Sequence, residues 1–381
     1  MKGGGFYCGR TTVTNSIISG NTADDFGGGF YGGGTTVTDS TISDNTANGF
    51  GGGFWAGGKT TVTNSTISDN TATGGGGFRT LNTSTVTNSI ISGNTAVEYG
   101  GGGFSSHSTI TVTNSTISGN TGIGGAGGID GSGTITDCTI SGNTTSFDGG
   151  GIHGGGNITN STISENTAGR NGGGIYAGDI TTVSNSTVSG NTSNNSGGGI
   201  FCNRAAIISN SIISSNTTSI NGGGLFADDI ITIVNSIIIE NIGTGSVFVN
   251  TGDTNRIVNS LFVNNGDYDI AGSPEVIATV YNNYIDESKI DILAFKNGNI
   301  LGGNLDFVDQ TNEDYHIGEN SVLIDAGTTS ISDITFPTTD FDGNDRIMGV
   351  AIDIGPYEFI TSSCDFFTIP NLNGSSAIIC L

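Results

Sequence analysis

The sequence has little positive charge, almost no proline and no long apolar run. Its 381 residues include 10 Lys and Arg against 34 Asp and Glu, which gives a formal net charge of −24. Nucleic acid and anionic membrane surfaces repel a chain of this charge, so we expect neither as a direct partner. No apolar run approaches the roughly 18 residues of a membrane helix, and the segment from Met1 to Phe6 lacks the apolar core of a signal peptide.

The negative charge is distributed unevenly along the chain. Residues 1–250 carry 14 acidic and 6 basic side chains, for a net of −8, whereas residues 251–381 carry 20 and 4, for a net of −16. This shift in composition indicates a boundary between a repetitive body and a different C-terminal region.

The 5 cysteines are too few and too scattered for a disulfide framework or a zinc site. Cys8, Cys138 and Cys202 lie in separate repeats, whereas Cys364 and Cys380 flank the last segment. An odd number leaves at least one free thiol. The pair in the tail would close a hairpin at 361–381 if it were oxidised, which requires an oxidising compartment. The alternative for this tail is a sorting or anchoring element.

A repeat of about 24 residues dominates the rest of the sequence. Eleven copies are aligned on an Asn or Asp in phrases such as VTNS, and a degenerate twelfth copy contains Asn282. The chain is rich in glycine, but an order this regular argues against a flexible linker. The anchor residues are Asn15, Asp39, Asn64, Asn88, Asn114, Asp137, Asn160, Asn185, Asn210, Asn235 and Asn259.

Each repeat has the apolar pattern of short strands rather than the i, i+3, i+4, i+7 pattern of a helix. An apolar β-branched residue lies two positions before the anchor, an apolar residue lies three positions after it, and a third follows a run of glycines. We expect positions −2 and 0 to face inward together, and the odd step to +3 to mark a corner. The sequence therefore predicts an all-β fold: a right-handed parallel β-helix with three sheets and about 12 coils over residues 1–290.

Two columns of identical residues should hold these coils in register. The Gly run is followed by Phe in five successive coils, Phe6, Phe30, Phe54, Phe78 and Phe104, which predicts a stack of rings. An Asn occurs six positions after every anchor, where its amide can bond the equivalent Asn in the coils above and below. These residues are Asn21, Asn45, Asn70, Asn94, Asn120, Asn143, Asn166, Asn191, Asn216, Asn241 and Asn265.

The consensus unit NSTISGNTA…GGGI resembles the repeats of bacterial surface β-helices of the pectin-lyase-like superfamily, including polymorphic outer membrane proteins. The phrases DFVDQTNEDYHIGENSVLIDAG (306–327) and TTDFDGNDRIMGVAIDIGPYEF (338–359) resemble the closing segment of choice-of-anchor Q proteins. Val322-Leu323, Asp345 and Pro356 depart from that family's usual residues.

This resemblance implies a secreted or surface-displayed bacterial protein with a structural or adhesive role. Extracellular glycans and components of host or cell surfaces are the partners that such a role implies. The resemblance also implies that residues 291–360 close the solenoid as a C-terminal cap. We expect no catalytic residue, cofactor-binding residue or metal ligand.

The alternative is a polysaccharide lyase or a glycoside hydrolase of the same superfamily. Such enzymes group acidic residues with an Arg or Lys in one groove. The basic residues of the repeats lie on separate coils, and no two successive coils place Asp, Lys and Arg in corresponding outward columns. These basic residues are Arg10, Lys59, Arg79, Arg170 and Arg204.

Histidines and one acidic turn are the remaining candidates for metal chemistry. His107 and His153 lie near the Gly-rich turns of coils two apart, without an evident third ligand, and His316 lies in the closing segment. The run DFDGND contains Asp340 and Asp342 at the alternating spacing of a calcium loop. It lacks the distal Glu of such a loop, and Asp-Gly-Asn is also ordinary turn chemistry.

Threonines form a further outward array. Positions −3 and −1 should point away from the core, and both are Thr in six successive coils, which resembles the face of ice-binding β-solenoids. A second alternative is therefore a glycan-binding or ice-binding face, although Thr also suits any exposed strand. The pairs are Thr12/Thr14, Thr36/Thr38, Thr61/Thr63, Thr85/Thr87, Thr111/Thr113 and Thr134/Thr136.

The first residues are already in register with the later coils, because Gly3 to Phe6 matches the Gly run and Phe of the next repeat. A solenoid that starts within a coil presents an uncapped edge, which favours edge-to-edge self-association. We therefore expect the chain to be a fragment of a longer secreted protein.

Overall fold

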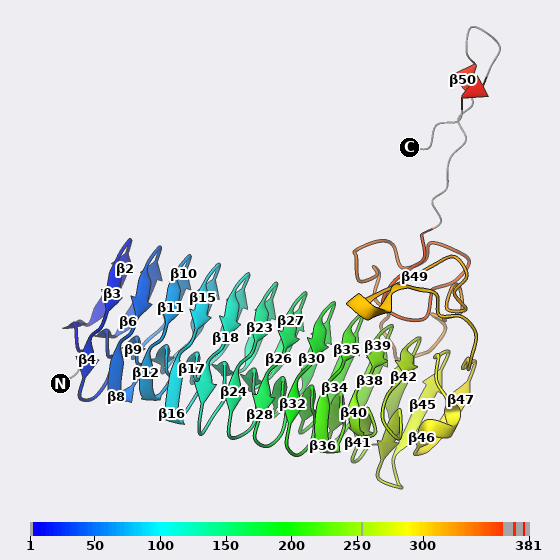
Figure 1. Cartoon of the computed structure of the whole chain (residues 1–381), viewed down its shortest axis with the longest axis horizontal. Coiled ribbons are helices and arrows are strands. Elements are labelled where there is room, and N and C mark those ends of the chain that lie inside the picture. The colour runs from blue at the N-terminus through cyan, green and yellow to red at the C-terminus, as the bar shows by residue number, and fades with distance from the viewer. Residues whose placement is uncertain (1–2, 253, 361–368, 371–375, 378–381) are drawn as a thin grey trace.

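The structure is a computed structural model that describes residues 3–252, 254–360, 369–370 and 376–377. Figure 1 shows a rod of stacked coils with a smaller lobe near its C-terminal end. The rod is a parallel β-solenoid, and the helical residues of the described chain are two 3-10 turns, η1 (Glu287–Lys289) and η2 (Gln310–Asn312). The predicted fold class is confirmed.

The coils form four parallel sheets, A to D, rather than the three that the sequence predicted, and the first ten coils contribute a strand to each sheet. The additional sheet D follows the Asn column, and its inward residues are small: Ala47, Ala72 and Ala96 are buried there. Alanine does not stand out in an apolar pattern, which is why this strand was missed. The strands of a typical coil are β9 (Phe54–Ala56), β10 (Thr60–Thr63), β11 (Thr66–Ser68) and β12 (Thr71–Gly74).

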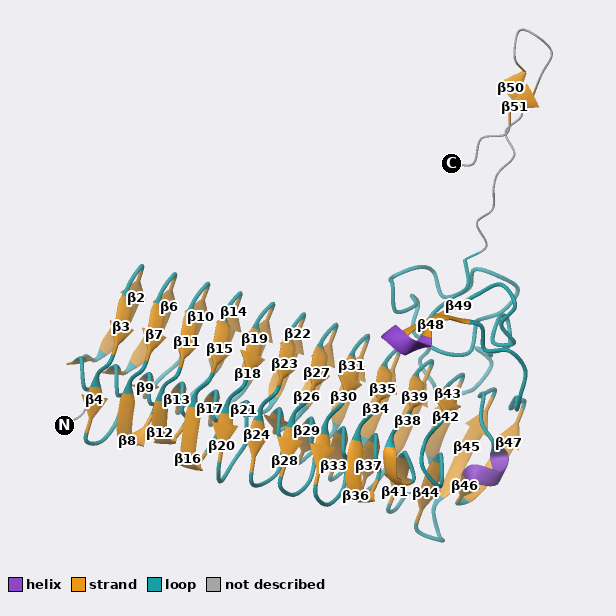
Figure 2. Cartoon of the chain, viewed as in Figure 1, coloured by secondary structure: helices purple, strands orange, loops and turns teal. Residues whose placement is uncertain are grey.

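Sheets A and B have 13 strands each, sheet C has 11 and sheet D has 10. Figure 2 shows these strands, in orange, repeated along the rod. Sheet B runs from β2 (Arg10–Thr14) to β47 (Leu293–Asn297), sheet C from β3 (Ile17–Ser19) to β43 (Leu261–Val263), and sheet D from β4 (Thr22–Ala23) to β40 (Ile242–Thr244). The strands of sheet A are β1 (Phe6–Tyr7), β5 (Phe30–Gly32), β9, β13 (Phe78–Thr80), β17 (Phe104–Ser106), β21 (Ile129–Asp130), β25 (Ile152–His153), β29 (Ile175–Ala177), β33 (Ile200–Cys202), β37 (Leu225–Ala227), β41 (Val247–Val249), β44 (Ile270–Gly272) and β46 (Ile290–Asp291).

The asparagine ladder is confirmed from Asn21 to Asn265. In a typical step, the main-chain N–H and the Nδ2 of Asn94 both donate to Oδ1 of Asn120, at 2.9 and 3.0 Å. Nδ2 of Asn94 also donates to the carbonyl of Ile67 in the preceding coil, at 2.9 Å. Each side chain thus satisfies main-chain groups at the corner between sheets C and D, where no strand ladder can.

The phenylalanine stack is also confirmed. Neighbouring rings from Phe6 to Phe104 lie 4.8 to 4.9 Å apart and are nearly parallel. This is the spacing of adjacent strands, so the rings stack because the coils stack. Phe30, Phe54, Phe78 and Phe104 are fully buried and fill the core of the first coils.

The anchor residues, predicted to face inward, are instead mostly exposed corner residues. Asn64 and Asn88 have a φ of +49°, the left-handed region that Asn tolerates better than other residues with a side chain. This left-handed turn between sheets B and C rotates the next residue inward. Ser65 is therefore buried, donates from Oγ to the carbonyl of Thr63 at 2.7 Å, and accepts from the N–H of Ser40 at 3.2 Å.

The C-terminal segment lies against the side of the rod rather than over its end. We call residues 305–359 the lateral lobe; it contains β48 (Phe307–Asp309) and β49 (Asp314–Ile317). Figure 1 shows the lobe beside the last strands of sheet C. Ile212, Ile237 and Leu261, on the outward side of that sheet, pack against Tyr315 and Leu323 of the lobe. Six of the eight earlier coils carry Thr at this outward position, and the other two carry Ile17 and Ile90, which are exposed. Three successive apolar residues at this position mark the docking surface.

The corner asparagines of the last coils also hold the lobe. Nδ2 of Asn210 and of Asn259 donate to the carbonyls of Thr339 and Thr328, at 2.6 and 2.8 Å. The N–H of Gly355 donates to the carbonyl of Asn259 at 2.8 Å. The same column that faces solvent in the first coils thus becomes an interface.

The coils continue past the boundary expected at residue 290, because β46 and β47 still pair with sheets A and B. Lys296 of β47 occupies the inward column of Val280 and donates to the carbonyl of Glu287 at 3.1 Å. A charge in an inward column opposes the addition of another coil. The solenoid extends beyond residue 290, to Ile300, which still forms a parallel bridge with Tyr284.

Beyond the lobe, β50 (Ile369–Pro370) pairs with β51 (Ser376–Ala377) in antiparallel fashion. Cys364 and Cys380, which we considered as a disulfide, lie outside the described residues. In the described part of the chain, no helix has the length and hydropathy needed to cross a bilayer.

Candidate functional site

In the acidic turn considered as a calcium site, protein hydrogen-bond donors contact both carboxylate oxygens of Asp340. Asp340 is fully buried, and its Oδ1 accepts from the N–H groups of Asp342 and Asn344, at 3.0 and 2.8 Å. Its Oδ2 accepts from Nδ2 of Asn344 and from the N–H of Glu358, at 3.1 and 3.2 Å. The structure thus accounts for Asp340 without a cation. Among the described residues, no group of three or more His, Cys, Asp or Glu side chains is placed to hold a metal ion.

Asp342 instead contacts His316, which bridges two carboxylates of the lateral lobe. The ring atoms Nδ1 and Nε2 of His316 lie 2.5 and 2.7 Å from carboxylate oxygens of Asp314 and Asp342. Both contacts are hydrogen bonds only when both ring nitrogens carry a proton. Partial burial lowers the pKa of His316, but the hydrogen bonds to the two carboxylates outweigh it and raise the pKa above its usual value.

We expect the lobe to lose stability as the pH rises through the folded-state pKa of His316. Because that pKa lies above the unfolded value, the stabilisation is complete below the unfolded pKa, about 6.5, and is lost at higher pH. The His316 side chain is 43 % exposed, so solvent screening limits the effect to about 1 kcal/mol. The measurement is the difference in melting temperature between the wild-type protein and a His316→Gln variant, from about pH 5 to about pH 9. A difference that stays constant over this range would contradict the prediction.

A column of outward residues on sheet A carries the other clustered polar groups. These residues directly follow the inward Phe, Ile, Leu or Val of the first eleven coils and are aligned by strand pairing. They are aromatic in the first three of these coils and in the last four, and polar between. This sheet A column comprises Tyr7, Tyr31, Trp55, Arg79, Ser105, Asp130, His153, Tyr176, Phe201, Phe226 and Phe248.

An open groove of about 460 Å³ lies over the polar middle of this column. It is lined by His107, Asp130, His153, Tyr176 and Asp179, together with Ser and Gly residues of the neighbouring turns. The strands of sheet A supply Asp130, His153 and Tyr176, whereas His107 and Asp179 come from the turns that lead into sheet B. We call this the sheet A groove.

Asp130 and His153 form the central pair of the groove. Nδ1 of His153 lies 3.1 Å from Oδ1 of Asp130, and Oγ of Ser105 donates to Oδ2 of Asp130 at 3.0 Å. The His153 ring stacks on Tyr176, with centroids 5.0 Å apart. The hydrogen bond to Asp130 raises the pKa of His153 above its usual value, although burial opposes this. The pair therefore places an imidazole that is protonated more readily than usual next to a carboxylate.

The remaining charged groups around the groove are also paired. Nη2 of Arg79 lies 2.9 Å from Nε2 of His107, and the guanidinium lies 4.0 Å from the centroid of the Phe50 ring. Since Arg79 can only donate, Nε2 of His107 is the acceptor in this contact. Nη1 of Arg204 lies 3.2 Å from Oδ1 of Asp179.

The repeat pattern of the sequence indicates only part of this site. It predicts His107 and His153 on turns two coils apart, and both line the groove. It does not reveal that Arg79, Asp130 and His153 share one outward column, with Ser105 between Arg79 and Asp130. Aligning the repeats on the apolar residue after the Gly run, instead of on the anchor, would have shown that column.

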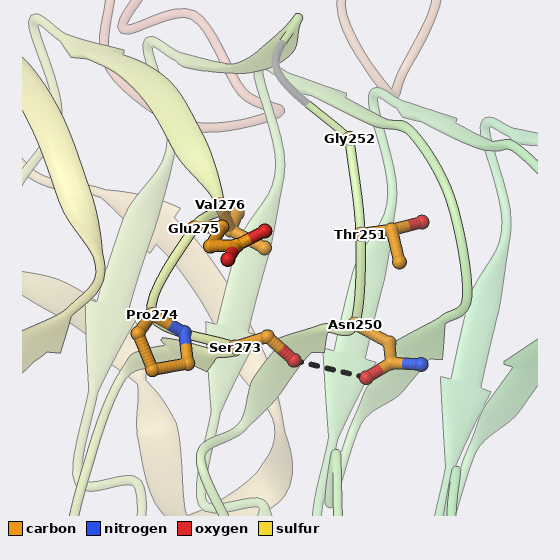
Figure 3. A pocket seen from close by; sticks show the side chains of 7 residues that line it. All are labelled: Asn250, Thr251, Gly252, Ser273, Pro274, Glu275 and Val276. Atoms are coloured by element: carbon orange, nitrogen blue, oxygen red, sulfur yellow. Dashed lines mark hydrogen bonds between the residues drawn. The ribbon is translucent and has the colours of Figure 1, made fainter.

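Two other surfaces are weaker candidates. The Thr pairs of sheet B are in register, as Thr36/Thr38 with Thr61/Thr63 illustrates, but threonine suits exposed strands in any case. The hollow in Figure 3, of about 620 Å³, contains one hydrogen bond, from Oγ of Ser273 to Oδ1 of Asn250. Its described lining residues include one carboxylate, that of Glu275, and neither an aromatic ring nor a histidine.

The fold agrees with one family model. Residues 5–129 match the model described as the right handed beta helix region. The fold therefore defines the chain as a right-handed parallel β-helix protein. No curated protein matches the sequence. Among solved structures, pectate lyase Pel9A matches with a TM-score of 0.38 and 16 % identity, over 94 % of this chain and 88 % of that chain. A similarity this low carries no argument about activity.

Proposed function

We propose that this chain is a non-catalytic β-helical rod of a bacterial surface or the extracellular space, with a structural and adhesive role. The observation that supports it is that the repeated polar residues serve the fold. The Asn ladder and the Ser column are buried and bonded within the stack, as Asn120 and Ser65 illustrate. Over most of its described length, the repetitive surface of the rod therefore presents no cluster of reactive side chains. The sheet A groove is the exception.

A polysaccharide-active enzyme is the second candidate, because the groove brings Arg79, Asp130 and His153 into one column. The rod is favoured because Arg79 is hydrogen-bonded to His107 and lies two coils from Asp130, so the column brings no Arg or Lys side chain into contact with that carboxylate. Enzymes of this kind group such residues in one groove.

The two candidates differ in what they do to a bound polysaccharide. We expect the protein to bind immobilised polysaccharides without releasing shorter products from them. The polymers tested include polyuronates, and each is tested both with calcium and with calcium chelated. Binding is measured by retention on the polymer, and cleavage by reducing ends and ultraviolet absorbance of unsaturated products. If the wild-type protein releases shorter products and an Asp130→Asn variant does not, the protein is an enzyme instead. Retention on no polymer would contradict the adhesive role.

A further inference from the structure

The rings of the sheet A column are spaced one per coil along the rod. Tyr31 and Trp55 have ring centroids 4.5 Å apart on one side of the polar middle. On the other side, Tyr176, Phe201 and Phe226 follow one another at 5.3 and 4.7 Å. Stacked rings cover each other's faces and leave their edges for contact. An extended pyranose unit is close to one coil spacing in length, so successive units of a linear glycan can meet successive rings.

The middle of the column supplies the polar contacts that sugar hydroxyls need. The side chains of His153 and Asp130 are 40 % and 29 % exposed. Each oxygen of Asp130 accepts one hydrogen bond from the protein and can accept another. Nε2 of His153 has no hydrogen-bond partner within the described residues, so it is open to a ligand hydroxyl, which can both donate and accept. Polar atoms of His153 and Asp130 side by side, next to the Tyr176 ring, fit a pair of vicinal hydroxyls.

The charge of the site favours a ligand without charge. Arg79 is bonded to His107, Asp130 to His153, and Arg204 to Asp179. A charged ligand would therefore meet only charged groups that already have a hydrogen-bond partner in the protein. The net charge of −24 also repels polyanions at long range.

We infer that the sheet A groove binds a neutral linear glycan that lies along the rod, with one unit over Asp130 and His153 and the next units on Tyr176 and Phe201. This inference rests on the proposed adhesive role and gives it a ligand class and an orientation. The polar middle selects hydroxyl geometry, and the aromatic ends add contact area with each further unit.

The test is calorimetric titration with the neutral series of cello-, laminari-, manno- and chito-oligosaccharides, each from two to six units long. We expect at least one series to bind, with an affinity that rises with chain length. Tyr176→Ala is expected to lower the affinity for the hexasaccharide about tenfold, because a ring contact and its packing are lost. Asp130→Asn is expected to lower this affinity about fivefold. Tyr99→Ala is the matched control, because Tyr99 is an exposed tyrosine outside the column and should leave affinity unchanged. Melting curves check that each variant remains folded.

Three outcomes would overturn the inference: no neutral hexamer binds at millimolar concentration, only charged oligomers bind, or binding survives both Tyr176→Ala and Asp130→Asn. Retention of the protein on whole polysaccharide separates this result from the proposed function. If retention persists while both variants leave it unchanged, the adhesive role stands and the groove is not its site. If retention itself is absent, the adhesive role fails first.

Discussion

Replacing Asn143 by Leu is expected to destabilise the solenoid by about 4 kcal/mol or more, although the side chains are similar in size. Asn143 is fully buried. Its Oδ1 accepts from the N–H and Nδ2 of Asn120, at 3.0 and 2.9 Å. Its Nδ2 donates to Oδ1 of Asn166 and to the carbonyl of Ile117, both at 2.9 Å. Leucine leaves these groups buried without partners, and each costs about 1–3 kcal/mol.

Chemical denaturation measures the loss, and hydrogen exchange shows where it falls, because a stack of repeats can open locally. We expect the amides of the neighbouring coils, including that of Asn120, to exchange faster. Asn157→Leu is the matched control, since Asn157 is exposed on an outward position of sheet B and should change stability by less than about 0.5 kcal/mol. Equal losses in the two variants would contradict a special role for the ladder.

The Asn ladder could be predicted because the same residue occurs at the same position of every repeat. Asn six positions after each anchor, and Phe after five Gly runs, stack on themselves once the chain forms parallel coils. The number of sheets could not be obtained in this way, because the inward residue of sheet D is Ala or another small residue. The prediction that the anchor residues face inward was also wrong. A left-handed corner residue such as Asn64 breaks the two-residue alternation on which that prediction relied.

The groove and the lobe were harder to predict because their contacts occur once. The pairing of Asp130 with His153 depends on the register of sheet A, which the anchor alignment obscures when turns differ in length. The lobe's position depends on the side of sheet C, where Ile237 and Leu261 replace threonine. That replacement is visible in the sequence, yet only the structure shows that the covering element is the chain's own C-terminal segment.

Removing the buried arginine of the lateral lobe is expected to unfold the lobe before the rod. Nη1 of Arg346 lies 3.0 Å from Oε1 of Glu358, and the two side chains are 3 % and 1 % exposed. Arg346 also donates to the carbonyl of Gly355. Asp340 and Asp353 are buried in the same region and add to its negative potential. Burial raises the pKa of Glu358, and Arg346 opposes that rise.

An Arg346→Met variant leaves these carboxyl groups buried without their counter-charge, a change that typically costs about 3–5 kcal/mol. We expect limited proteolysis to cut within the lobe of this variant while the coils stay resistant. A double variant, Arg346→Met with Glu358→Gln, should recover part of the loss, because it removes the unpaired acid as well. Arg204→Met is the matched control: its ion pair with Asp179 has side chains 63 % and 72 % exposed and should contribute almost nothing. If Arg346→Met is no more sensitive to protease than Arg204→Met, the buried pair does not hold the lobe, and its docking depends instead on the apolar contacts with sheet C.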